Sequence, residues 1–149
     1  MSDHVLRLVP NKPLFLPDPA AASGAVALLR AYFPQAQEVK SKYFESVSFI
    51  DAGENWEGVS CPACGADAEP WWGEAVSAAT SAGVSSLATQ ALCCGTSLQL
   101  NELKYGWPVA FGRFVLDVLN PNALGLAPEQ LAQLSAQLGC QLLTVHARV

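Results

Sequence analysis

The sequence predicts an α+β fold in which two strand–helix–strand units form one sheet with the helices packed on it, and a cysteine-bearing insertion separates the units. Two observations lead to this prediction. Stretches that alternate apolar and polar residues flank each of two amphipathic helical stretches, 19–33 and 128–138. Four of the five cysteines lie between the units. We therefore expect residues 1–149 to form a single domain, with residues 53–108 inserted in it.

The first unit starts with a short strand over residues 5–9. Asp18 followed by Pro19 is typical of an N-cap and a first helical residue, so a helix begins there. Pro34 ends this helix because proline cannot continue it. The apolar face of the helix consists of Ala22, Val26, Leu29 and Phe33. Residues 46–52 alternate and are rich in β-branched and aromatic side chains, which predicts the second strand.

The second unit starts with a strand over residues 111–119. One face of this strand is formed by Phe114, Leu116 and Val118. Pro128 then opens a helix, and Gly139 is suited to its C′ position. The apolar face of this helix consists of Leu131, Leu134 and Leu138. Residues 140–149 alternate again and form the last predicted strand.

The insertion contains shorter elements. Residues 56–60 form a short strand that leads to a cysteine turn, and a helix runs from Pro70 to about Thr80. Residues 86–92 fit either a strand or a helix. Their position next to a second cysteine turn favours the strand.

Two short turns carry the four cysteines of the insertion. The first has the sequence Cys61-Pro62-Ala63-Cys64-Gly65, the second ends in Cys93-Cys94-Gly95, and 28 residues separate Cys64 from Cys93. Two cysteines spaced by two residues and followed by glycine are typical of a zinc-ribbon turn, and two such turns complete a tetrahedral thiolate site. The insertion is therefore predicted to be zinc-ribbon-like and to hold a structural zinc ion. The predicted metal ligands are Cys61, Cys64, Cys93 and Cys94.

The second turn departs from the regular pattern. When Cys94 is aligned with Cys64, Ala91 stands where the other ligand is expected. Either Cys93 and Cys94 both bind the metal, or one binds and the fourth ligand lies elsewhere, or the turns hold no metal. A thioredoxin-like redox pair is disfavoured, because the second cysteine of such a pair enters a helix. Here Gly65 follows Cys64 directly.

Charge is distributed unevenly along the chain, whose net charge is −5. No Lys or Arg occurs between Lys42 and Lys104, whereas the same segment contains eight acidic residues. This argues against nucleic acid as its partner, since phosphate binding requires Lys and Arg, and it favours a basic protein. The sequence also lacks an apolar run long enough to span a membrane and a secretion signal, so no membrane association and a cytoplasmic location are expected.

The tryptophans cluster around the cysteine turns. Either they cover the metal site as a small core, or one of them, Trp71, is exposed and anchors a partner, as Trp often does at protein interfaces. Acidic residues beside it would steer a basic partner. The residues predicted to bind a partner are Glu54, Trp56, Glu57, Trp71, Trp72 and Glu74.

Catalytic motifs are absent from the sequence. The two histidines are His4, at the start of the chain, and His146, on the solvated face of the last strand, and neither has a triad partner nearby in sequence. No nucleophile elbow, phosphate-binding glycine loop or His-Glu-x-x-His motif occurs. We therefore expect that the protein is not an enzyme.

Several motifs between Phe49 and Pro121 resemble a family of small uncharacterised bacterial zinc-ribbon-like proteins. They are Phe49-Ile50-Asp51, Asn55-Trp56, the two cysteine turns, Ser97-Leu98, Asn101-Glu102-Leu103, Tyr105-x-Trp107-Pro108 and Phe111-x-Arg113-Phe114. The chain also resembles toxin-immunity proteins in its size and acidity. This resemblance implies a partner that is a basic toxin or nuclease, and no catalytic residue. The alternatives are a regulatory or adaptor zinc ribbon in a larger complex, and a CxxC redox or metal-dependent enzyme.

Overall fold

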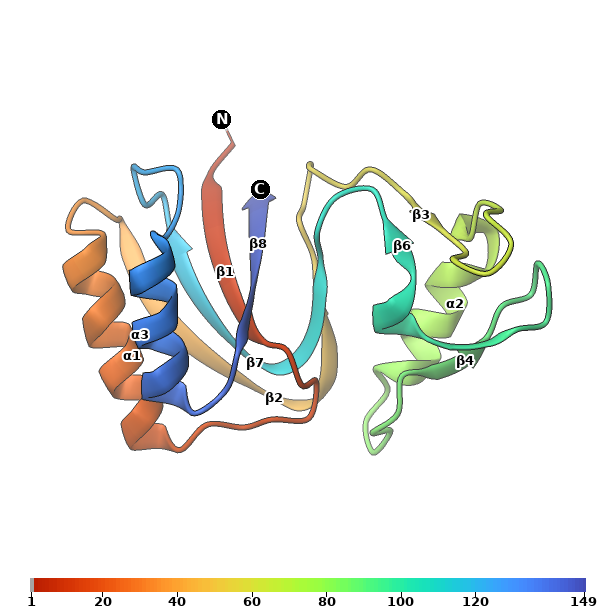
Figure 1. The fold of residues 1–149 in the computed structure, drawn as a ribbon, viewed down its shortest axis with the longest axis horizontal. Coiled ribbons are helices and arrows are strands. Elements are labelled where there is room, and N and C mark those ends of the chain that lie inside the picture. Colours follow the sequence, from red (N-terminus) through yellow and green to blue (C-terminus); the bar gives the residue numbers. More distant parts are fainter. Residues whose placement is uncertain (1) are drawn as a thin grey trace.

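The computed structural model describes residues 2–149 and consists of a sheet-and-helix frame and a smaller insertion (Figure 1). The frame contains four strands and two helices. In chain order these are β1 (His4–Pro10), α1 (Pro19–Tyr32), β2 (Glu38–Ile50), β7 (Ala110–Leu119), α3 (Pro128–Leu138) and β8 (Leu142–Arg148).

The four strands form one antiparallel sheet in the order β2-β7-β1-β8. Helices α1 and α3 lie side by side on one face of this sheet (Figure 1). The main core lies between the two layers. It includes Leu6, Leu8, Ala25, Leu29, Phe114, Leu116, Val118, Leu134 and Leu138. The predicted α+β class, with two strand–helix–strand units in one sheet, is confirmed, and the strand order is that of a split βαβ, ferredoxin-like arrangement.

Local sequence signals set the ends of both frame helices. Asp18 has an extended backbone at the N-cap of α1, and Pro19 is the first helical residue. Helix α3 ends at Leu138 and is followed by Gly139, whose φ of 82° is left-handed and suits glycine because it has no Cβ.

Strand β2 starts at Glu38, eight residues before the predicted start at residue 46. It is an edge strand, so it is hydrogen-bonded to a neighbouring strand along one edge only. Most side chains of its first half are exposed. A bulge between Tyr43 and Ser48 interrupts the register with β7. The bulge breaks the two-residue alternation from which a strand is predicted.

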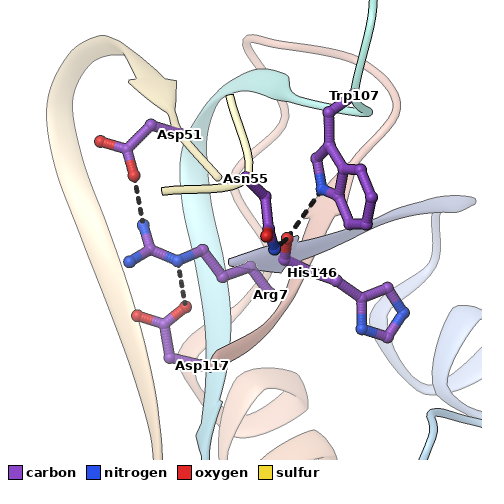
Figure 2. A network of polar contacts seen from close by, with 6 residues as sticks. All are labelled: Arg7, Asp51, Asn55, Trp107, Asp117 and His146. Atoms are coloured by element: carbon purple, nitrogen blue, oxygen red, sulfur yellow. Dashed lines mark hydrogen bonds and ion pairs between the residues drawn. The ribbon is translucent and has the colours of Figure 1, made fainter. Parts of the chain in front are cut away.

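A second, smaller core lies on the helix-free face of the sheet. Its buried members are Val9, Ile50, Ala52, Ala110, Val115 and Val145. Beside it, Arg7 on β1 lies between two carboxylates, with Nη1 3.7 Å from Asp51 and Nε 3.8 Å from Asp117 (Figure 2). These pairs are looser than hydrogen bonds.

The insertion contains only short elements. They are β3 (Val59–Ser60), α2 (Glu69–Ala79), β4 (Ala88–Gln90), β5 (Ser97–Gln99), a 3₁₀ turn (Leu100–Glu102) and β6 (Lys104–Tyr105). Strand β3 pairs with β6, and β4 pairs with β5. Their shared core joins buried residues of the insertion to Val47 and Phe111 of the sheet. The insertion therefore packs on the end of the β2–β7 pair.

The connections at the base of the insertion are bound to the edge of β8. The backbone N–H of Arg148 donates to the carbonyl of Ala52 (3.1 Å), and that of Glu54 donates to the carbonyl of Arg148 (2.7 Å). The side chains of Asn55 and Trp107 both donate to the carbonyl of His146, at 3.0 and 2.8 Å (Figure 2). These bonds fix how the insertion leaves and re-enters the sheet.

Every helix within residues 2–149 is too short or too polar to serve as a bilayer-spanning segment.

Candidate metal centre

The structure brings the Sγ atoms of Cys61, Cys64, Cys93 and Cys94 within 4.8 Å of one another. Across the two turns, Cys61 and Cys94 are 3.8 Å apart, and Cys64 and Cys93 are 3.4 Å apart. A tetrahedral zinc ion with Zn–S bonds of about 2.3 Å requires S–S separations of about 3.8 Å. The cluster therefore has the dimensions needed to hold one metal ion.

The two cysteine turns share one backbone conformation. The N–H of Gly65 donates to the carbonyl of Cys61 (2.8 Å), and the N–H of Gly95 donates to the carbonyl of Ala91 (2.7 Å). Gly65 and Gly95 have φ values of 77° and 76°, which favour glycine. Ala91 thus occupies the place that Cys61 occupies in the first turn.

Both Cys93 and Cys94 belong to the cluster. Ala91 is fully buried and offers no sulfur, and Cys93, one residue before Cys94, brings its Sγ to the Sγ of Cys64. The adjacent pair Cys93 and Cys94 therefore contributes two sulfurs, as the first of the sequence alternatives requires.

The cluster lies at the surface. Cys61 is 1% exposed, whereas the other three cysteines are exposed. Hydrogen bonding by Thr96, whose Oγ1 lies 3.2 Å from Sγ of Cys94, lowers the pKa of Cys94 to about 7. Desolvation, together with hydrogen bonds among the thiols, raises the pKa of Cys93 to about 12. Without a metal, the thiol of Cys94 therefore ionises more readily than that of Cys93.

The donor set consists of sulfur alone. Among residues 2–149, no histidine or carboxylate joins the group. Four thiolates in tetrahedral arrangement are typical of structural zinc sites, in which no position is open to a substrate. Helix α2 starts at Glu69, five residues after Cys64, so the geometry of a thioredoxin-like pair is not present at this turn.

Trp71 is not exposed, so of the two alternatives for the tryptophans the one in which Trp71 anchors a partner is wrong. Trp71 is 7% exposed and lies in the core of the insertion, and its Nε1 has no hydrogen-bond partner within residues 2–149. Helix α2 contacts the core of the insertion with more than one of its sides. The adjacent Trp71 and Trp72 therefore both pack in this core, where Trp71 is buried and Trp72 is partly buried. Trp71 is therefore unavailable to a partner.

Trp56 and Trp72 are half-buried and held in an aromatic group. Their ring centroids are 4.9 Å apart, and both pack edge-on against Phe49. The indole N–H of Trp56 donates to Oε1 of Glu69 (2.9 Å), and that of Trp72 donates to the hydroxyl of Tyr105 (3.1 Å). Each ring therefore has a fixed orientation.

A shallow groove of about 910 Å³ lies beside the first cysteine turn. Its lining includes Trp56, Glu57, Ser60, Gly65, Asp67, Glu69, Lys104 and Tyr105. Of the predicted partner-binding residues, only Trp56 and Glu57 line it, whereas Glu54 and Glu74 are exposed elsewhere on the insertion. Asp67 and Glu69 also line the groove but were not among the residues predicted to bind a partner, although their position directly after the first cysteine turn is a usable signal.

All eight acidic residues between Lys42 and Lys104 are exposed. Within residues 2–149, Asp51 alone among them forms an ion pair, with Arg7. The carboxylates of the groove therefore have no cation from the described residues, 2–149, within ion-pair distance.

The two histidines lie outside this site. His4 belongs to β1 and is not part of a frayed end, and its Nε2 lies 3.1 Å from Nδ1 of His146. Desolvation, the neighbouring His146 and Arg148 lower the pKa of His4. The contact joins strands from opposite ends of the chain, so it had no signal in the sequence.

The chain was compared with known proteins at three levels. No protein-family model matches it, and searches of the curated proteins and of the solved structures gave no significant match.

Proposed function

We propose that this protein is a non-enzymatic protein-binding module, stabilised by a structural zinc ion bound to Cys61, Cys64, Cys93 and Cys94. The observation that carries the proposal is the cluster of four sulfurs within 4.8 Å beside a groove lined by carboxylates that form no ion pair within residues 2–149. We infer further that the module is of immunity type and neutralises a basic bacterial toxin, such as a nuclease, by binding it.

The zinc ion has a structural role in this proposal. The insertion contains one helix of 11 residues and strands of two or three residues, which provide few backbone hydrogen bonds between distant segments. A metal ion that ties the two cysteine turns together supplies folding free energy that such short elements lack. The metal thereby holds the groove in shape.

The acidic groove is the proposed contact surface. Glu57, Asp67 and Glu69 line the groove together with the half-buried ring of Trp56, and Lys104 is the one basic residue of the lining. Exposed carboxylates whose charge is not balanced by an ion pair attract a basic protein and raise its association rate. A fixed tryptophan ring adds apolar contact area and a face for a guanidinium group.

Metal analysis tests the zinc ion. Protein purified without added zinc is expected to contain one zinc ion per chain, and removal of the ion with a chelator is expected to lower the melting temperature. Protein that contains no metal and has four titratable thiols in the insertion would contradict this part of the proposal.

Partner capture from the host tests the binding function. We expect one basic protein at equal stoichiometry, with a complex that weakens at high salt. The double variant Glu57→Gln with Asp67→Asn removes two groove charges but keeps their hydrogen-bonding atoms, and Asp67→Asn preserves the bond from the N–H of Glu69 to Oδ1. It should bind more slowly than the wild type.

The matched control is Glu45→Gln with Glu129→Gln, which removes two exposed acids outside the groove. Equal binding by the two double variants would show that the groove is not the contact surface. Recovery of a stable complex of several subunits would instead favour an adaptor role.

A further inference from the structure

We propose that the cysteine cluster is also an oxidation-sensitive switch, in which a peroxide joins the two turns by disulfides, releases the metal and changes the groove. The inference rests on the zinc site of the proposed function. It assigns two linkages, first Cys64–Cys93 and then Cys61–Cys94.

The distances favour bonds between the turns. The two short S–S separations, 3.4 Å for Cys64–Cys93 and 3.8 Å for Cys61–Cys94, each join one turn to the other. A disulfide of about 2.05 Å requires each pair to close by less than about 2 Å. Each turn then retains its own backbone bond, between Gly65 and Cys61 or between Gly95 and Ala91.

Exposure sets the order of the two linkages. Cys64 and Cys93 are both exposed, so a small oxidant reaches either sulfur directly. Cys61 is 1% exposed, which protects the Cys61–Cys94 pair. Loss of the first pair leaves the metal with two sulfur ligands, too few to retain it.

The groove shares its wall with the first cysteine turn. Ser60, Gly65 and Asp67 line the groove, and Cys61 and Cys64 lie between them in the chain. The N–H of Cys61 donates to the carbonyl of Ala66 (2.8 Å), which ties the cysteine to the wall. Movement of Cys61 and Cys64 toward the other turn therefore moves the groove wall, so oxidation and partner release are coupled.

The chemistry balances with a peroxide as oxidant. A thiolate sulfur attacks one peroxide oxygen, an S–O bond forms and the O–O bond breaks, which releases hydroxide. The second thiolate attacks the resulting sulfenic sulfur, the S–S bond forms and a second hydroxide leaves. Formation of each disulfide thus transfers two electrons from a pair of thiolates to one peroxide molecule. Two peroxide molecules therefore oxidise all four thiolates. The zinc ion leaves without a change of charge.

The test uses zinc-loaded protein that carries Cys140→Ala, so that the half-buried fifth thiol outside the cluster does not react. Hydrogen peroxide is added in steps, released zinc is measured with a colorimetric chelator, and disulfides are mapped by mass spectrometry without reduction. The expected result is loss of one zinc ion and four thiols per chain. The Cys64–Cys93 peptide should appear before the Cys61–Cys94 peptide, and dithiothreitol with zinc should reverse the change.

Hydrogen exchange on the same samples tests the coupling to the groove. Oxidation should raise the exchange of residues 57–69 and leave helix α3, in the frame, unchanged. Retention of zinc in excess peroxide, linkage of Cys61 to Cys64 instead, or unchanged exchange over residues 57–69 would each overturn the proposal. If the purified protein holds no metal, the zinc site fails, but the pairing of the thiols is still decided by mapping the metal-free reduced protein.

Discussion

Ala91 and Cys61 occupy the same position in two turns of the same conformation, and both side chains are buried. Ala91 therefore stands where a regular zinc ribbon would place a sulfur ligand. Cys93 supplies that sulfur from two residues farther along the chain. The cluster is thus complete although the sequence pattern is irregular.

Moving the ligand from position 93 to position 91 should preserve zinc binding. Cys93→Ala alone removes one of four ligands and should cost about 3 kcal/mol, a quarter of the binding free energy typical of a structural zinc site. The double variant Ala91→Cys with Cys93→Ala should recover that loss. Competition with a chromogenic chelator measures both affinities, and a double variant as weak as Cys93→Ala would show that the two turns are not equivalent.

Burial of His4 beside His146 should make the protein less stable in mild acid. The folded state lowers the pKa of His4, so below about pH 6.5 the unfolded chain binds more protons than the folded chain. The contribution of His4 is therefore fully present above that pH and is lost as the pH falls toward the lowered pKa. Urea midpoints between about pH 7 and pH 5 measure the loss.

His4→Gln is the control for this pH dependence. Its uncharged side chain keeps a hydrogen-bonding group near His146 but does not titrate, so its midpoint should vary less with pH over the same range. A variant with the same pH dependence as the wild type would exclude His4 as the cause.

Replacement of Arg7 should lower the free energy of unfolding more than replacement of Asp117. Burial raises the pKa of Asp117 in spite of the attraction of Arg7, so the carboxylate is costly to keep charged. Asp117→Asn removes that charge and should change the free energy of unfolding by less than about 1 kcal/mol. Arg7→Gln leaves Asp117 without its nearest cation and should cost about 1–3 kcal/mol. Urea unfolding at neutral pH compares the two, and an equal or reversed ranking would contradict the argument.

Gly53 should tolerate no side chain. Its φ is +58°, and a Cβ there would clash with the carbonyl of Arg148 at the point where the insertion is bound to β8. Gly53→Ala should therefore cost more than the roughly 1–2 kcal/mol of a left-handed alanine alone. Gly139→Ala is the matched control, because Gly139 has a φ of +82° and open space around it. Similar melting temperatures for the two variants would show that the close approach is unimportant.

Both helices of the frame could be predicted from local sequence signals. Helix α1 runs over Pro19–Tyr32, close to the predicted 19–33, because the apolar spacing and the proline at its start are properties of neighbouring residues. Helix α3 ends as predicted before Gly139 for the same reason. The first half of β2 was missed because Lys40, Ser41 and Lys42 are exposed on an edge strand and carry no alternation.

The site was only partly predictable. The spacing of Cys61 and Cys64 indicated a metal turn, but whether Cys93 reaches the same point depends on the backbone geometry of the second turn. The burial of Trp71 depends on what packs around helix α2, which a helical repeat does not reveal. The groove combines Glu57, Asp67 and Lys104, which come from separate segments, so their proximity is a property of the fold.

The attachment of the insertion has a consequence for the order of folding. Ile50 and Ala110 are partners in the β2–β7 register, and the whole insertion lies between them. In an unfolded chain, pairing these strands must close a long loop, and the entropic cost of closure grows with loop length. An insertion that first collapses around its own cysteine turns brings the two strand ends together and shortens the effective loop. Metal should therefore accelerate formation of the sheet, although no cysteine turn belongs to it.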